Sequence, residues 1–391
     1  MIAIDTTFFA HSEAKNKKLT YSTSIFTADL LDAFVQLGAA ANFCLIVNFN
    51  HVDFFKERFP AYKIVAAKWW PVTLLYRLTR GRKTATKLIK KCGSFRKIAE
   101  KCGAKAIWFP YAMNETFART SLKTFATIHD IYRIHHGTKK EAAKFTEFIN
   151  DKTTSLITIS NYTKNDIINT TGCKKDIPVI PNSIVFDVSR QQKVPELEQK
   201  KYILDLNAYV EKKNPMTLLK AFNLIKDKTS LNLVFCGGYK EESVWNEMQK
   251  YIQDNQLSSR VKLLFRVKDE ERNWLLANAA LFATPSLFEG FGRTPVEAAI
   301  CKVPVISTKE TSLFEATHGL CNYVENATDE KELAELMLNI IENPPKEKRL
   351  EEIAKKLARI YQAENCAKKY MQVFQEHGIN KILQNWQQAV L

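Results

Sequence analysis

Short apolar runs of strand length alternate with amphipathic stretches of helix period through both halves of the chain. This alternation with short links predicts parallel sheets covered by helices on both faces. The expected strands are Met1–Asp5, Phe43–Asn48, Lys105–Phe109, Phe125–His129, Leu156–Ser160, Ile177–Ile180, Tyr202–Leu206, Leu231–Cys236, Val261–Phe265, Leu281–Thr284 and Val303–Ser307. The expected helices include Ser24–Leu37, Pro215–Ile225, Ser243–Asp254 and Asp269–Asn278.

The alternation occurs twice and is interrupted once, by the polar, strandless stretch 187–200. We therefore expect two α/β domains, each a Rossmann-like doubly wound sheet, over residues 1–187 and 200–365. Helices over 366–391 are expected to pack back toward the first domain. Two such domains are expected to face a central cleft, because ligands bind at the carboxyl ends of parallel strands.

Composition limits the class of protein. Hydrophobic residues make up 46% of the 391 positions, but no apolar run reaches 18 residues, so no membrane-spanning helix is expected. Asp5 comes too early for a secretory signal. The eight cysteines lack C-x-x-C spacing, which favours reduced thiols over disulfides or zinc. These features predict a cytoplasmic protein.

The net charge of +15 is concentrated in the first half. Residues 63–103 hold 12 basic residues and one acidic residue, interleaved with aromatic ones. This pattern suits an anionic membrane surface or a phosphate backbone, although a solvated helix face also accounts for it. Since no nucleic-acid motif is present, we expect peripheral contact with the inner face of the membrane and no nucleic-acid partner. The expected membrane or acceptor contacts are Trp69, Trp70, Arg77, Arg80, Arg82 and Lys83.

The richest chemical pattern follows the expected strand Leu281–Thr284. Gly290 and Gly292 precede Thr294-Pro295-Val296-Glu297, which resembles an S/T-x-x-E capping box with proline at the first helical position. A helix N-terminus favours an anion, and Arg293 adds a cation there. Glu297 has a purely structural interpretation as the capping partner, whereas Glu289 in the preceding loop is harder to explain by structure alone.

Two further positions carry candidate chemistry. Lys213 lies between an expected strand and the helix start Asn214-Pro215, although a lysine in such a place is usually only solvated. His129 ends an expected buried strand, where a histidine is often a hydrogen-bonded core residue. The sequence contains no P-loop, zinc spacing or nucleophile elbow, and Pro295 replaces the third glycine of a dinucleotide fingerprint. No metal or cofactor is therefore expected.

Residues 288–298, FEGFGRTPVEA, are similar to the E-x7-E signature of retaining, two-domain GT-B glycosyltransferases, particularly family 4. Other landmarks of that family match in order, among them TIHDI (127–131), VIPNSI (179–184), NAYVEKKNP (207–215) and PVIST (304–308).

This resemblance implies roles for particular residues. Glu289 would contact the hydroxyls of the donor sugar and His129 would lie near the reacting sugar, as the catalytic residues. Glu297 would bind the ribose of the nucleotide, and Lys213 would neutralise its diphosphate. The remaining expected donor-binding residues are Gly290, Phe291, Gly292, Arg293, Arg266 and Asn207.

The chain departs from the family at two places. Asn207-Ala208 stands where many relatives carry Gly-Arg, so that Arg293 or Arg266 would have to replace one cation. The glycine-rich loop usual after the first strand is missing, since 6–21 contains no glycine.

The implied activity is metal-independent, retaining transfer of a sugar from a nucleotide-diphosphate sugar to a glycan or lipid-linked acceptor. Such transfer would belong to cell-surface polysaccharide or glycolipid synthesis. A non-catalytic basic protein that binds membranes or nucleic acid is the alternative. The base and the sugar of the donor cannot be derived from the residues.

Overall fold

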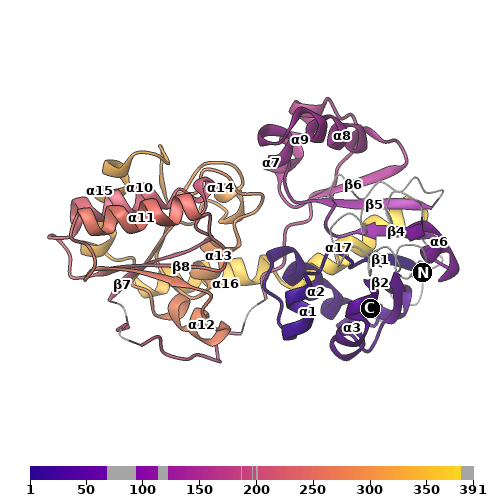
Figure 1. Cartoon of the computed structure of the whole chain (residues 1–391), viewed down its shortest axis with the longest axis horizontal. Coiled ribbons are helices and arrows are strands. Elements are labelled where there is room, and N and C mark those ends of the chain that lie inside the picture. The colour runs from indigo at the N-terminus through magenta and orange to yellow at the C-terminus, as the bar shows by residue number, and fades with distance from the viewer. Residues whose placement is uncertain (68–93, 113–121, 186, 196, 200, 380–391) are drawn as a thin grey trace. The chain divides into compact units, whose positions relative to one another are not determined.

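The computed structural model describes residues 1–67, 94–112, 122–185, 187–195, 197–199 and 201–379. The chain divides into two compact units. The first contains Met1–Ser183 together with Ala363–Leu391, and the second contains Ile184–Gln362. Figure 1 labels most of the helices and strands of both units.

The first unit is built on a parallel six-stranded sheet of order β3-β2-β1-β4-β5-β6 (Figure 1). Its strands are β1 (Ile2–Asp5), β2 (Phe43–Asn48), β3 (Lys63–Ala67), β4 (Ala106–Phe109), β5 (Lys123–Ile128) and β6 (Thr154–Thr158). Its helices are α1 (His11–Asn16), α2 (Ser22–Gln36), α3 (Val52–Arg58), α6 (Ser94–Lys101), α7 (Tyr132–His136), α8 (Lys139–Asn150), α9 (Asn161–Thr171) and α17 (Ala363–Phe374).

The second unit contains a parallel six-stranded sheet of order β12-β11-β10-β7-β8-β9. Its strands are β7 (Tyr202–Leu206), β8 (Asn232–Gly237), β9 (Val261–Phe265), β10 (Leu281–Ala283), β11 (Val305–Thr308) and β12 (Asn322–Val324). Its helices are α10 (Pro215–Ile225), α11 (Glu242–Asp254), α12 (Asp269–Asn278), α13 (Arg293–Ile300), α14 (Leu313–Ala316), α15 (Glu330–Glu342) and α16 (Glu347–Ile360).

Both sheets have the same topology. Numbered along each unit, the strands follow the order 3-2-1-4-5-6 of the Rossmann fold, so the predicted pair of doubly wound α/β units is confirmed. The strand order reverses between β1 and β4 in the first sheet and between β7 and β10 in the second. Ligands of such sheets bind beside the carboxyl ends of the strands at this switch point.

The strand predictions were wrong at three places near the sheet edges, although the edge strand β9 (Val261–Phe265) was predicted with its bounds. The run Ile177–Ile180 forms a single bridge between Thr158 and Val179 instead of a strand. The edge strands β3 and β12 were missed because neither shows a fully buried apolar run. Lys63 at the start of β3 is exposed, and β12 is only three residues long.

The expected link 187–200 is also corrected, because the boundary between the units falls between Ser183 and Ile184. The Asn273 amide of α12 donates hydrogen bonds to the backbone oxygens of Asp187 (2.6 Å) and Arg190 (3.2 Å). These bonds to buried Asn273 hold the start of the polar stretch against the second unit, which its composition does not reveal.

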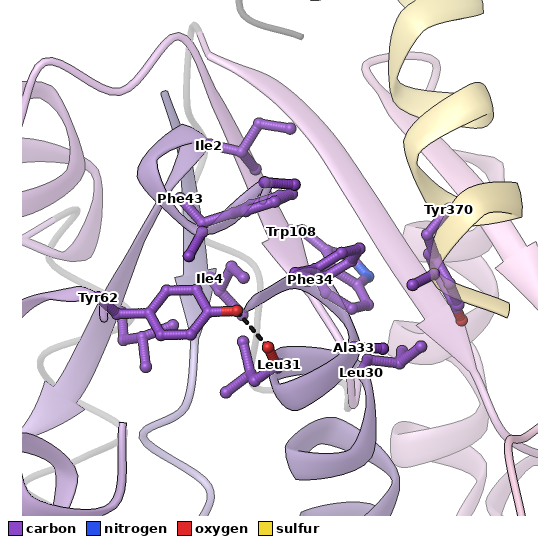
Figure 2. Packing of buried hydrophobic residues seen from close by; sticks show 14 of the residues in the cluster. Ile2, Ile4, Leu30, Leu31, Ala33, Phe34, Phe43, Tyr62, Trp108 and Tyr370 are labelled. Atoms are coloured by element: carbon purple, nitrogen blue, oxygen red, sulfur yellow. Dashed lines mark hydrogen bonds between the residues drawn. The ribbon is translucent and has the colours of Figure 1, made fainter. Parts of the chain in front are cut away.

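Helices α2 and α17 supply much of the core of the first unit. Figure 2 shows Leu30, Phe34 and Trp108 packed beside Tyr370 of α17. The Trp108 ring lies 4.8 Å from the Tyr370 ring, and its Nε1 donates to Thr127 Oγ1 (3.0 Å). The chain therefore returns to its first unit after completing the second.

None of the helices in the described ranges is long and apolar enough to cross a membrane. The expected membrane contacts between Trp69 and Lys83 lie outside the described residues.

Candidate active site

Two loops meet at the switch point of the second sheet. The chain leaves β7 and forms the short 3₁₀ turn Glu211–Lys213, and it leaves β10 through the loop 284–292. The amides of Leu287 and Phe288 both donate to the Lys212 carbonyl, at 2.9 and 3.3 Å. The strand order therefore joins two segments that are more than 70 residues apart in the sequence.

Asn214 fixes this junction. Its backbone is left-handed, with φ 54° and ψ 45°, a conformation that asparagine tolerates better than most residues. Its Nδ2 donates to the carbonyls of Pro285 (3.1 Å) and Ala327 (2.7 Å), and its Oδ1 accepts from Thr217 Oγ1 (2.8 Å). The side chain that opens α10 thus ties the turn containing Lys213 to the loop after β10.

Lys213 and Glu289 form an ion pair across the two loops. The Lys213 ammonium donates to Glu289 Oε1, and the side chains are only 13% and 15% exposed. The Glu289 backbone is held on both sides, since its amide donates to Thr311 Oγ1 (3.0 Å) and its carbonyl accepts from Ser312 Oγ (2.9 Å). The structure thus brings together the residues expected to bind diphosphate and sugar.

A buried polar network lies at the carboxyl ends of β7 and β10. The Asn207 amide donates to Asp205 Oδ1 (2.5 Å) and to Thr284 Oγ1 (3.0 Å). Asp205 is 3% exposed, and burial raises the pKa of its carboxyl to about 7 against the opposing effects of Asn207 and Lys213. Asn207 therefore links the carboxyl ends of β7 and β10 by side-chain hydrogen bonds.

Helix α13 begins two residues earlier than the capping box suggested. Gly292 is its N-cap, with left-handed angles of φ 92° and ψ 64°, which residues with a Cβ rarely adopt. Thr294 and Pro295 then occupy the second and third helical positions, so the predicted N-cap at Thr294 is wrong. The first turn, which begins at Arg293, carries the partial positive charge that attracts anions.

Glu297 is not a capping partner, because the N-cap of α13 is Gly292 and not Thr294. It is paired with two arginines instead. Its Oε2 accepts from the Arg272 guanidinium of α12, and its Oε1 lies 3.4 Å from the Arg293 guanidinium. The Glu297 side chain is 3% exposed, against 28% for Arg272 and 12% for Arg293. One buried carboxylate between two cations leaves a net positive cluster shared by α12 and α13.

Other expected donor-binding residues have different surroundings. Phe291, between Gly290 and Gly292, is 5% exposed, and its ring lies 5.3 Å from Tyr361. Arg266 follows the edge strand β9 and lies over the Phe265 ring at 4.9 Å. Since β9 is separated from β7 by β8, the structure does not bring Arg266 to the two loops at the switch point.

His129 lies in the first unit, at the carboxyl end of β5. Its Nε2 donates to the Pro110 carbonyl (2.9 Å), and its ring is edge-on to Phe26 (5.0 Å) and Tyr111 (5.7 Å). Burial lowers the pKa of His129 despite the bond to Pro110. The hydrogen bond to Pro110 orients the ring, and the role of His129 near the reacting sugar remains a prediction.

The sequence interpretation missed Asp205 and Arg272. Asp205 interrupts the apolar strand YILDL, and a carboxylate there signals burial of a charged group. Arg272 lies near the start of α12, where the helix dipole disfavours a cation and a local acidic partner is needed. In the part of the chain that the structure describes, no cluster of three or more His, Cys, Asp or Glu side chains could hold a metal ion.

Residues 187–357 match the family described as Glycosyl transferases group 1. The chain is 34% identical over 148 residues to the alpha-1,3/1,6-mannosyltransferase ALG2 of Dictyostelium discoideum, covering 32% of this chain and 35% of that relative. It is 26% identical to O-antigen chain mannosyltransferase B of Escherichia coli, covering 64% of this chain and 67% of the relative. The chain thus spans about a third of the length of the first relative and two thirds of the second.

Among solved structures, Anabaena HepE in complex with UDP and glucose has a similar fold. The TM-score is 0.68 at 15% sequence identity, covering 96% of this chain and 99% of that chain. Residues 187–357 are thus similar to the glycosyl transferases group 1 family, and the paired 3-2-1-4-5-6 sheets give the chain the GT-B fold.

Proposed function

We propose that this protein is a retaining, metal-independent glycosyltransferase that moves a sugar from a nucleotide-diphosphate sugar to a glycan or lipid-linked acceptor. The single observation that supports it most is the convergence of Lys213, Glu289 and the start of α13 at one switch point. A cation, a hydrogen-bond acceptor and an anion-attracting helix end are the groups that a sugar diphosphate requires.

Departure of the nucleoside diphosphate is the step that needs charge stabilisation. As the bond between the anomeric carbon and the phosphate oxygen breaks, negative charge grows on the diphosphate. We assign its stabilisation to Lys213, Arg293 and the first turn of α13, which are preorganised by Asn214 and Gly292. These groups supply positive charge from the protein itself, which is why the proposal requires no metal.

Glu289 and Glu297 are assigned to the neutral parts of the donor. When the diphosphate takes the Lys213 ammonium, Glu289 is free to accept hydrogen bonds from the sugar hydroxyls. Glu297 accepts from the ribose. The acceptor hydroxyl then attacks the anomeric carbon on the face that the diphosphate leaves and transfers its proton to the departing phosphate oxygen, so the configuration is retained.

The relatives support the acceptor class. The ALG2 and O-antigen relatives are named as mannosyltransferases, and the second is named for the O-antigen chain. We therefore infer a role in the synthesis of a cell-surface polysaccharide or glycolipid. Since HepE was solved with UDP and glucose, UDP is the first nucleotide to examine.

Thermal unfolding in the presence of UDP, GDP, dTDP, ADP or CMP tests this proposal. One diphosphate at a hundredfold excess over its Kd is expected to stabilise the fold by about 2.7 kcal/mol. The shift should be equal in EDTA and in magnesium, because the site uses protein cations. Inorganic pyrophosphate is the control for simple anion binding, and an equal effect of pyrophosphate and every nucleotide would contradict a nucleotide site.

We further propose that the basic segment 63–103 holds the enzyme on the inner face of an anionic membrane. Each Lys or Arg near such a surface contributes about 1 kcal/mol, and salt weakens the attraction. The protein is expected to sediment with vesicles of phosphatidylglycerol and phosphatidylcholine at low salt and less at high salt. Binding to DNA but not to these vesicles would instead favour a nucleic-acid-binding protein.

A further inference from the structure

Arg272 comes from a helix that is fixed on two sides. The Trp274 ring of α12 stacks on Tyr202 of β7 (5.9 Å, 25°), and the Tyr202 hydroxyl donates to the Leu275 carbonyl (2.9 Å). On the other side Asn273 is bonded to the backbone near Asp187. Helix α12, which carries Arg272, is therefore held in place on two sides, and the Arg272 guanidinium contacts Glu297 of α13.

The two contacts of Glu297 are not equivalent. Arg272 makes a charge-assisted hydrogen bond to Oε2, whereas the Arg293 contact to Oε1 is 3.4 Å long. A normal N–H···O bond between charged groups is about 2.7–2.9 Å. A ligand hydroxyl can consequently replace Arg293 at Oε1 more readily than it can replace Arg272 at Oε2.

We propose that Arg272 is a positioning residue that fixes the Glu297 carboxylate so that Oε1 accepts a hydrogen bond from a ribose hydroxyl of the donor. This inference rests on the proposed function. When the donor binds, the Arg293 side chain moves from Glu297 to the diphosphate. Arg272 then keeps the buried Glu297 carboxylate charged and oriented. The Arg272 guanidinium donates its hydrogen bond to Glu297, so we assign Arg272 to recognition of ribose and not to the binding of phosphate.

Isothermal calorimetry on the full chain with UDP, GDP, 2′-deoxy-UDP and 2′-deoxy-GDP tests this role. Wild-type protein is expected to bind the ribonucleotide of its preferred base at least about tenfold more tightly than the 2′-deoxy form, since a buried hydroxyl bond to a charged group is lost. Arg272→Gln should reduce this preference to about threefold or less and leave the Kd of the deoxynucleotide within about threefold.

Two further variants and a stability measurement show whether the effect of Arg272→Gln is specific to the guanidinium. Arg272→Lys should restore part of the preference, because it keeps the cation but loses the guanidinium geometry. Lys302→Gln, which removes an exposed ion pair with Glu351, is the matched control and should behave like wild type. Thermal unfolding of each variant shows that it is folded.

An unchanged preference in Arg272→Gln would overturn the positioning role. A loss of affinity that is equal for the ribonucleotide and the deoxynucleotide would also overturn it, because that result assigns Arg272 to the phosphates or to general stability. Failure of wild-type protein to bind any nucleotide of the thermal unfolding panel would overturn the proposed function itself, and this inference with it.

Discussion

Replacing Lys213 by alanine is expected to lower the rate of sugar transfer by about 10²–10³-fold, the usual cost of removing one preorganised group that stabilises developing charge. The expectation follows from the position of Lys213, because its ammonium is paired with Glu289 in a half-buried junction between the two switch-point loops. Release of the diphosphate from the nucleotide sugar identified by the thermal panel measures the effect. Lys213→Arg should retain part of the rate.

The same substitution also leaves Glu289 without its partner, so the stability of the variant must be measured together with its rate. The double variant Lys213→Ala with Glu289→Gln removes the charge imbalance and separates the two effects. Lys220→Ala is the matched control, because Lys220 is an exposed lysine of the neighbouring helix α10. A double variant that is as stable and as active as wild type would assign the pair to no step of the reaction.

The fold could be predicted because its signal is local. A central strand of a parallel sheet is buried on both faces and therefore appears as an apolar run, as β1, β2, β7 and β8 do. Edge strands such as β3 are less completely buried, so their sequences do not appear as apolar runs. The boundary at Ile184 could not be predicted either, since it depends on hydrogen bonds between Asp187, Arg190 and Asn273 across more than 80 residues.

The candidate site could be predicted only in part, for a related reason. Lys213 and Glu289 stood beside glycine, proline and asparagine signals that mark loops and helix starts. The partners of Glu297 depend on the packing of α12 against α13, and the local S/T-x-x-E pattern favoured a capping box that the structure does not form. The left-handed backbone of Gly292 makes Gly292 the N-cap of α13 instead of Thr294, and the spacing of residues along the sequence does not predict this backbone conformation.

Asp205→Asn is expected to stabilise the second unit at neutral and alkaline pH. The pKa of Asp205 is about 7 in the folded protein and 3.8 for an ordinary aspartate. Between these values the unfolded chain loses the proton and the folded chain keeps it, so the free energy of unfolding falls as pH rises. At about 1.4 kcal/mol per pKa unit, the cost above pH 7 approaches about 4 kcal/mol.

The asparagine side chain keeps the oxygen that accepts from Asn207 and carries no charge, so it avoids that cost. Urea unfolding of both proteins should therefore give similar free energies near pH 4 and a growing advantage for Asp205→Asn up to pH 8. The charged neighbours Lys213 and Glu289, and the buried Tyr209 and Cys236, interact electrostatically with this carboxyl.

Asp254→Asn at the exposed end of α11 removes a carboxylate of the same type and is the control for the change in net charge. A difference between Asp205→Asn and wild type that does not depend on pH would mean that Asp205 is ionised throughout and is stabilised by Lys213. The Lys213→Ala variant distinguishes these cases, because removing the nearby cation raises the folded pKa of Asp205 further. The loss of stability then still begins near the unfolded pKa, but it continues to a higher pH and becomes larger. Selection for maximal stability would have removed a buried carboxyl of this kind. Asp205 interacts electrostatically with both Lys213 and Glu289, so we attribute its retention to the function of this site, at the expense of the stability of the fold.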